Sequence, residues 1–341
     1  MKNRILPVFI PFAGCRQRCV YCSQNSITGH TSSEIVSSAE QQIKENLEIS
    51  GNWDELAYYG GSFTCLPEKL RLKLYALAHG YGFEKLRFST SPDCVTDENM
   101  AEAAAHGVET VEIGVQSLDD EVLRLNKRPC CAAETIDALK TVKRHAIRLS
   151  AQIMTGMYGE NFHSFDATVD AVLSVKPDYV RIYPCVVLKD TELYSLWQSG
   201  EHISLPLAET LARCAYALIL FEADGIDVIR IGLQDAESMK EQIAAGEYHP
   251  ATGDMAKTIA VAIYLGLGHN LVLDKKYINT AYGYNGYNRE TCEGRLEIKD
   301  GAKPDIRAIC KRITEVESYK RYIQRQAAFH AERLVGSPDN R

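Results

Sequence analysis

The sequence predicts an α/β fold: a partial (β/α)6 barrel of the TIM type followed by a small mixed α/β C-terminal subdomain. Short apolar runs alternate with amphipathic helical stretches through the first two thirds of the chain. Consecutive strands joined by helices have to be parallel, because each crossover is long and right-handed. With 341 residues and 45% hydrophobic composition, the chain can bury a large core.

Strand and helix signals follow one another in a regular order. After a short apolar strand and a cysteine-rich loop, helical periodicity and runs rich in β-branched and aromatic residues alternate. Strands are expected at residues 5–12, 55–59, 86–90, 110–115, 149–155, 179–183 and 228–233. Helices are expected at residues 33–50, 67–81, 97–106, 132–146, 164–175 and 206–223.

The regular alternation of strand and helix signals ends after about residue 235. We therefore expect a barrel domain over residues 1–235 and a C-terminal subdomain over residues 236–341, which covers the barrel mouth or binds substrate. One long helix is expected near its end, from about residue 304 to 334.

Charge and hydropathy narrow the class of protein. A formal net charge of −7 argues against a protein that binds nucleic acid over its whole surface. Residues 289–341 hold 12 Lys/Arg and 9 Asp/Glu, so this stretch is either a site for an anionic partner or a solvated helical face. No apolar run is long enough to cross a membrane, and no signal peptide is recognisable. We expect a cytoplasmic protein without a membrane segment.

Eleven cysteines without a secretory signal favour metal or catalytic use over a disulfide framework. Cys15, Cys19 and Cys22 follow the first expected strand with the spacing C-x3-C-x2-C. Three thiolates on one loop would leave one iron of a cluster open to a small molecule, whereas structural iron–sulfur and zinc sites usually take four ligands. The alternative is three buried or zinc-binding cysteines. The other eight show no ligand spacing and are expected to be buried thiols, with redox activity as the alternative for the adjacent pair Cys130 and Cys131. The eight are Cys65, Cys94, Cys130, Cys131, Cys185, Cys214, Cys292 and Cys310.

Further polar and glycine-rich runs follow later strands. Gly60, Gly61 and Ser62 come directly after the second expected strand, where two glycines let a small polar ligand approach the backbone. A simple turn would explain them too. Gln116 ends the fourth strand and Gly156 follows the fifth, so all these runs lie on the rim where barrels of this kind build active sites.

The cysteine triplet together with these runs resembles the radical S-adenosylmethionine (radical SAM) superfamily. Tyr21, just before the last cysteine, matches the aromatic residue that the family usually carries there. The resemblance implies a [4Fe–4S] cluster on the three cysteines, with S-adenosylmethionine on the open iron. The resemblance also implies that the amino group of S-adenosylmethionine contacts Gly60, Gly61 and Ser62 and that its carboxylate contacts Lys127 or Arg128. Its ribose would contact Gln116, and its adenine would contact Ile153 and Gly156. Alternatively, Gln116 and Arg128 are ordinary rim residues, and Ile153 is a core residue.

Over residues 5–235 the chain resembles the radical SAM domain of the Elongator catalytic subunit and its bacterial look-alikes. Residues 181–184 and 191–200 carry this resemblance. Ser89, Ser91 and Arg181 depart from that branch, which usually carries other charged groups there. The last hundred residues hold no pyrophosphate loop of an acetyltransferase, so acetyl-CoA use is not expected.

The resemblance implies an enzyme in which a reductant such as flavodoxin or ferredoxin drives cleavage of S-adenosylmethionine into methionine and a 5′-deoxyadenosyl radical. The substrate is unidentified; tRNA bound through the C-terminal subdomain is one candidate, since tyrosines there could stack bases. Packing over the barrel mouth would explain the same tyrosines: Tyr277, Tyr282, Tyr284 and Tyr287. The other functions considered are a coproporphyrinogen-dehydrogenase-like enzyme and a non-catalytic protein that binds the cluster and S-adenosylmethionine. No residue is singled out as catalytic.

Overall fold

The computed structural model describes residues 4–10, 13–23, 32–233 and 241–336. Two compact units are distinguished. The first comprises Met1–Ile153, Asp170–Tyr179 and Asp190–Glu192, and the second comprises Met154–Val169, Val180–Lys189 and Leu193–Arg341. The expected boundary after residue 235 falls within residues 234–240, outside the described residues, and stays a prediction.

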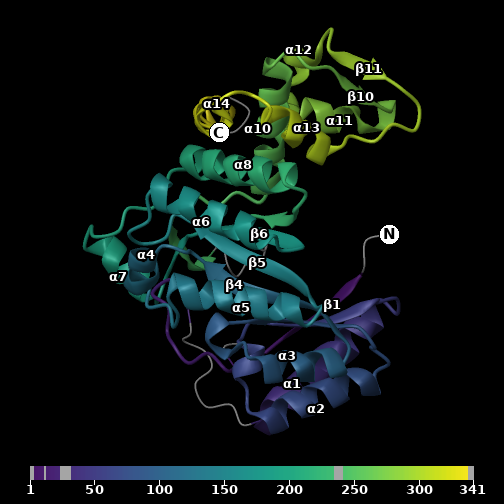
Figure 1. Ribbon diagram of the computed structural model, residues 1–341, viewed down its shortest axis with the longest axis vertical. Helices are drawn as coiled ribbons and strands as arrows, with labels where there is room; N and C mark the ends of the chain where they lie inside the picture. The colour runs from purple at the N-terminus through teal and green to yellow at the C-terminus, as the bar shows by residue number, and fades with distance from the viewer. Residues whose placement is uncertain (1–3, 11–12, 24–31, 234–240, 337–341) are drawn as a thin grey trace. The chain divides into compact units, whose positions relative to one another are not determined.

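A seven-stranded sheet has its strands in chain order, and the pairs from β1 to β5 are parallel. Sequential parallel order with helical crossovers is the arrangement of a half-barrel, so the predicted fold class is confirmed (Figure 1). The strands are β1 (Ile5–Phe9), β2 (Glu55–Tyr59), β3 (Leu86–Thr90), β4 (Val108–Gln116), β5 (Arg148–Thr155), β6 (Tyr179–Pro184) and β8 (Asp227–Ile231).

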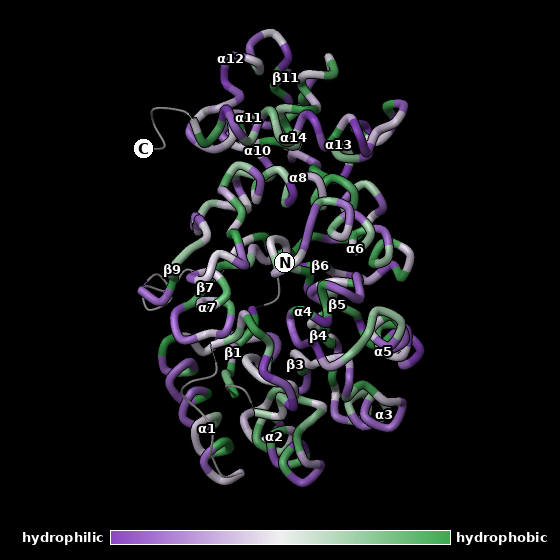
Figure 2. The backbone as a smooth tube through the Cα atoms, turned by 90° about the vertical axis from the view of Figure 1, so that its left-hand side faces the viewer, coloured by the Kyte–Doolittle hydropathy of each residue, from purple (hydrophilic) through white to green (hydrophobic). Residues whose placement is uncertain are grey.

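The six helices expected before residue 235 each form within a few residues of their predicted bounds. Apolar residues at helical spacing are buried while the opposite face is polar, and Figure 2 shows both kinds alternating along α1 and α2. Thr96 caps α3 by accepting a hydrogen bond from the Asn99 amide at 3.2 Å. These helices are α1 (Ser32–Ile49), α2 (Glu68–Gly80), α3 (Asp97–Ala105), α5 (Ala132–Arg144), α6 (Phe162–Val175) and α8 (Leu207–Ala223).

The second unit packs several helices around α8, most of whose residues are buried. Its partners α10 (Thr252–Gly266), α13 (Ile306–Ile313) and α14 (Tyr319–Val335) supply apolar faces. Two small sheets complete the unit, an antiparallel pair of β7 (Val187–Leu188) with β9 (Ile243–Ala245) and a parallel pair of β10 (Leu271–Leu273) with β11 (Leu296–Ile298). The short helices α4 (Asp120–Leu125), α7 (Glu192–Gln198), α11 (Ile278–Tyr282) and α12 (Arg289–Cys292) are on connections.

The single helix expected at residues 304–334 is wrong. α13 ends at Ile313 and α14 begins at Tyr319. Ser318 between them has a left-handed φ of +56°, which a continuous helix does not allow. Both helices have one apolar face, so hydrophobic periodicity alone does not reveal the break between them.

No helix among the described residues combines the length and the hydropathy that a membrane crossing requires.

Candidate functional site

The loop that follows β1 interlocks with the loop that follows β2. The Ser62 amide donates to the Ala13 carbonyl at 2.9 Å, and a Cβ at Gly61 would lie 2.4 Å from that same carbonyl oxygen. A Cβ at Gly14 would lie 2.2 Å from the Ser62 carbonyl oxygen, and Gly14 has a φ of +82°. Both glycines are therefore required for the contact between the two loops.

Cys15, Cys19 and Cys22 lie on the first of these loops, and none of the three forms a disulfide. Cys15 is exposed, whereas Cys19 and Cys22 are partly exposed and joined by a turn in which the Cys22 amide donates to the Cys19 carbonyl at 3.0 Å. Three accessible thiols on one short loop are the donor set that an iron–sulfur cluster takes. The residues present fit such a group.

Arg128, from the connection between α4 and α5, lies against this loop. Its guanidinium donates to Cys19 Sγ at 3.3 Å, to the Tyr21 hydroxyl at 3.4 Å and to the Gly114 carbonyl. Burial by itself would lower the pKa of Arg128, but Tyr21 and Cys19 raise it on balance, so the side chain keeps its charge. Arg128 thus connects the cysteine loop to the end of β4.

Gln116 has an uncommon backbone conformation at the end of β4. The ladder between β4 and β5 skips a residue between Gly114 and Gln116, and Gln116 has a φ of +66°, which favours glycine. Its buried Oε1 has no hydrogen-bond partner among the described residues, and neither has the buried Oγ of Ser91. Buried polar atoms are normally paired, so both positions suit a polar ligand.

Ser62 is buried, and its hydroxyl is engaged within the protein. It accepts from the Ser91 amide at 2.9 Å, lies 3.1 Å from Thr90 Oγ1 and donates to Cys65 Sγ at 3.0 Å. Gly60 turns the chain just before it with a φ of +88°. The Ser62 side chain therefore ties the end of β2 to the end of β3, and backbone groups are what this loop offers a ligand.

Cys65 and Cys94 form a disulfide, and the expectation of buried thiols is wrong for this pair. They lie on the 3-10 helices η1 (Phe63–Cys65) and η2 (Pro92–Cys94), which follow β2 and β3. Because β2 and β3 are neighbours, the two helices lie at the same edge of the sheet, and the Cα atoms of the two cysteines are 5.1 Å apart. The expectation is also wrong for Cys131, which is exposed because it lies at the start of α5. It is confirmed for Cys130, Cys185, Cys214, Cys292 and Cys310.

Ile153, which belongs to the first unit, is fully buried on β5. Gly156 belongs to the second unit and has a φ of +84°. Its amide donates at 2.7 Å to Glu160, whose carboxylate also accepts from Arg213 at 2.7 Å. Burial raises the pKa of Glu160 to about 7. Glu160 and Arg213 were not predicted from the sequence. The one signal for this pair is a glutamate shortly after the glycine that follows β5.

A buried charge network in the first unit was also missed. Arg87 on β3 forms ion pairs with Glu55 at 3.0 Å and with Glu112 at 3.1 Å. Glu112 further accepts from the Tyr59 hydroxyl at 3.0 Å and from Gln152 Nε2 at 2.9 Å. From the sequence, a loss of charge is expected at Ser89 and Ser91, yet β3 carries a charged side chain at Arg87.

The tyrosines of the C-terminal region are partly buried within the second unit. The Tyr284 hydroxyl lies 3.3 Å from His249 Nε2, and the Tyr287 hydroxyl lies 3.0 Å from His330 Nδ1. Arg289 lies over the ring of Tyr282, with its Cζ 5.2 Å from the ring centroid. Lys276 lies similarly over Tyr277. These contacts are those of packed residues.

Two family models match the chain along most of its length. Residues 9–172 match the radical SAM superfamily, and residues 177–260 match the radical SAM C-terminal domain. The chain belongs to the radical SAM superfamily. Members of this superfamily are enzymes that use a [4Fe–4S] cluster and S-adenosylmethionine, as the sequence predicts.

This radical SAM chain is similar to a named relative in part of its sequence and to two solved structures in its fold. The tRNA uridine(34) acetyltransferase of Methanocaldococcus infernus is 32% identical over 135 residues, which cover 39% of this chain and 25% of the relative. The solved structure of Methanocaldococcus infernus Elp3 matches with a TM-score of 0.58 and 21% identity over 74% of this chain and 61% of that one. Coproporphyrinogen III oxidase (HemN) from Escherichia coli matches with a TM-score of 0.50 and 19% identity, over 68% and 63% of the two chains. The two structures share the fold, and the chain spans only a quarter of the length of the acetyltransferase.

Proposed function

We propose that Cys15, Cys19 and Cys22 hold a [4Fe–4S] cluster with which this chain cleaves S-adenosylmethionine reductively and modifies tRNA. The observation that carries the proposal is a loop of three accessible thiols that interlocks with the Gly60–Ser62 turn. When bound, the cluster and S-adenosylmethionine supply an electron and a carbon radical.

The residues around the loop have distinct proposed roles. Backbone groups at Gly60 and Gly61 face the amino group of S-adenosylmethionine, and the unpaired Oε1 of Gln116 accepts from a ribose hydroxyl. Arg128 keeps its charge beside Cys19 and pairs with the carboxylate.

Proposed contacts to the adenine come from the end of β5 and from the loop beyond it. Ile153 offers an apolar side chain, and Gly156 offers its backbone. These two residues are described in separate units, and their joint role is part of the proposal.

The proposed substrate class rests on two observations. One relative is named a tRNA uridine(34) acetyltransferase, and residues 289–341 carry 12 Lys/Arg against 9 Asp/Glu. Acetyl transfer is not part of the proposal. The proposal includes a barrel domain over residues 1–235, a substrate-binding or covering subdomain over residues 236–341, a flavodoxin or ferredoxin as reductant, and a cytoplasmic location.

Anaerobic reconstitution tests the cluster assignment. After one-electron reduction with dithionite, wild-type protein is expected to show a [4Fe–4S]+ electron paramagnetic resonance signal that S-adenosylmethionine perturbs. Cys19→Ala is expected to lose it, while Cys131→Ser, an exposed free cysteine outside the loop, keeps it. Full iron loading in Cys19→Ala would refute the assignment.

The substrate class is tested by 5′-deoxyadenosine formation under strong reduction. We expect bulk tRNA to stimulate turnover above the level without substrate, and coproporphyrinogen III not to. Stimulation by the porphyrinogen alone would support the haem-pathway alternative. Binding of S-adenosylmethionine without any cleavage would support a non-catalytic protein.

A further inference from the structure

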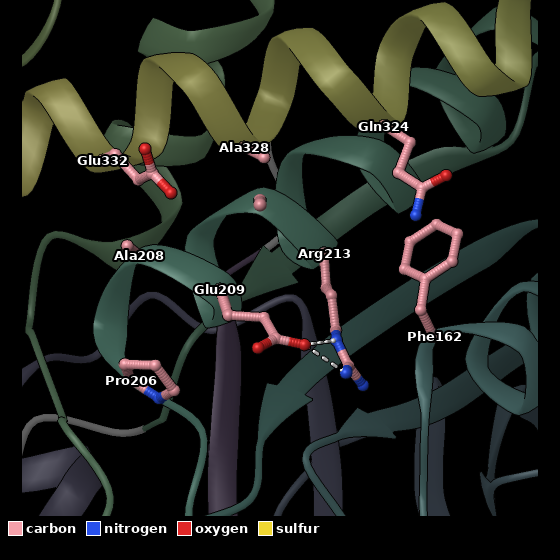
Figure 3. Close-up of a pocket in the computed structure, with 9 residues that line it drawn as sticks. Phe162, Pro206, Ala208, Glu209, Arg213, Gln324, Ala328 and Glu332 are labelled. Atoms are coloured by element: carbon pink, nitrogen blue, oxygen red, sulfur yellow. Dashed lines mark hydrogen bonds and ion pairs between the residues drawn. The ribbon is translucent and has the colours of Figure 1, made fainter.

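The second unit contains a cavity of about 330 Å³ between α8 and α14 (Figure 3). Its apolar wall includes the ring of Phe162 together with Pro206 and Ala328. Ligand cavities in proteins typically begin at about 300 Å³ and combine such apolar walls with a few polar groups. None of the lining residues belongs to the proposed cofactor site.

The one cation among the described lining residues is already neutralised. Arg213 donates through Nη1 to Glu160 at 2.7 Å and through Nε to Glu209 at 3.1 Å, and its Nη2 also contacts Glu209. Only 5% of the Arg213 side chain is exposed. An anionic ligand would therefore have to displace a buried carboxylate partner, which is costly.

Negative charge remains in excess at the cavity. Glu209 uses one carboxylate oxygen to bind Arg213, and its second oxygen has no hydrogen-bond partner among the described residues. Glu332, on the opposite wall, makes no ion pair within the described part of the chain. It also lies in the last turn of α14, where the partial negative charge of the helix end favours cations.

We propose that this cavity binds a small organic cation, an amine or guanidinium on an aromatic or otherwise apolar body. The charged head pairs with Glu209 and Glu332, and the body packs against Phe162 and Pro206. Neither the chemistry of the cluster nor S-adenosylmethionine enters this proposal, so the two stand or fall separately.

Isothermal titration calorimetry of the full chain with three matched probes tests the charge requirement. Phenethylammonium is expected to bind. The neutral 2-phenylethanol should bind at least about fivefold more weakly, and the anionic phenylacetate not measurably. Equal affinity for the neutral or the anionic probe would overturn the proposal, as would an absence of phenethylammonium binding.

Two substitutions locate the site. Glu332→Gln is expected to weaken phenethylammonium binding about fivefold, whereas Glu293→Gln, at an exposed glutamate elsewhere in the second unit, leaves it unchanged. Ala328→Trp fills the cavity from an exposed helix position and should abolish binding with an unchanged circular dichroism spectrum. Undiminished binding in both Glu332→Gln and Ala328→Trp would place the ligand elsewhere and refute the site. Cys19→Ala should bind as the wild type does, which separates this test from that of the cluster.

Discussion

Gly61 lies where the loop after β2 touches the cysteine loop. The sequence predicts that its missing side chain serves the approach of a ligand. The structure adds a second role, because a Cβ there would lie 2.4 Å from the Ala13 carbonyl oxygen and 2.8 Å from that of Ile10. A side chain at this position therefore has to displace the loop that carries the cysteines.

For this reason Gly61→Val is expected to lower iron loading as well as S-adenosylmethionine affinity. From the sequence alone, iron content would be expected to stay unchanged. Iron and sulfide analysis after reconstitution distinguishes the two. A replacement at Gly51, whose Cβ would have open space, is the matched control, and full loading of Gly61→Val would contradict the interlocked geometry.

Glu160 gives the stability of the protein a predicted pH dependence. Its pKa is raised by burial to about 7 from an ordinary value of 4.5. Between these values the folded state binds more protons than the unfolded state, so this residue's contribution to stability is present below pH 4.5 and is lost as pH rises through 7. Glu160→Gln does not titrate.

The free energy of unfolding of wild type, relative to Glu160→Gln, should therefore fall by on the order of 3 kcal/mol between pH 4.5 and pH 8. Urea unfolding at several pH values measures it. Glu293→Gln controls for a general effect of removing an acid. Parallel stability profiles for wild type and Glu160→Gln would show that burial does not raise this pKa.

Element by element, local signals found the strands well and the connections poorly. β2 and β3 have their predicted bounds because each is a short run of strand-favouring residues between turn signals. α10 is rich in apolar residues and was not predicted as a separate helix, because the sequence indicated only a mixed α/β region there. The η1 and η2 helices are three residues each, too short for any periodicity, and the disulfide that joins them is a product of strand pairing.

The disulfide predicts a thiol count. Alkylation of denatured, metal-free protein without reductant should modify nine of the eleven cysteines, and all eleven after reduction. A Cys65→Ser/Cys94→Ser double variant should give nine under both conditions. Eleven modified cysteines in unreduced wild type would show that the bond does not form.

At the scale of the whole molecule, we expect the core to form without the three loop cysteines. The core consists of the sheet and the helices around it, whereas the three loop cysteines are exposed or partly exposed. Substitutions at accessible positions usually change stability by less than about 0.5 kcal/mol.

The Cys15→Ala/Cys19→Ala/Cys22→Ala variant should therefore keep the far-ultraviolet circular dichroism spectrum of metal-free wild type, with a Tm within about 2 °C. It should bind no iron. Loss of secondary structure in this variant would mean that the cysteine loop takes part in folding.

The sequence by itself determined the fold class, the bounds of most strands and helices, and the family, because hydrophobic periodicity, turn residues and motif spacing are local properties of the chain. Tertiary structure alone decided which distant residues meet. Cys65 and Cys94 pair because β2 and β3 are neighbours, Arg87 joins Glu55 to Glu112 across three strands, and Arg213 reaches Glu160 over 53 residues of chain. Such contacts depend on strand order and helix packing, which no local pattern records.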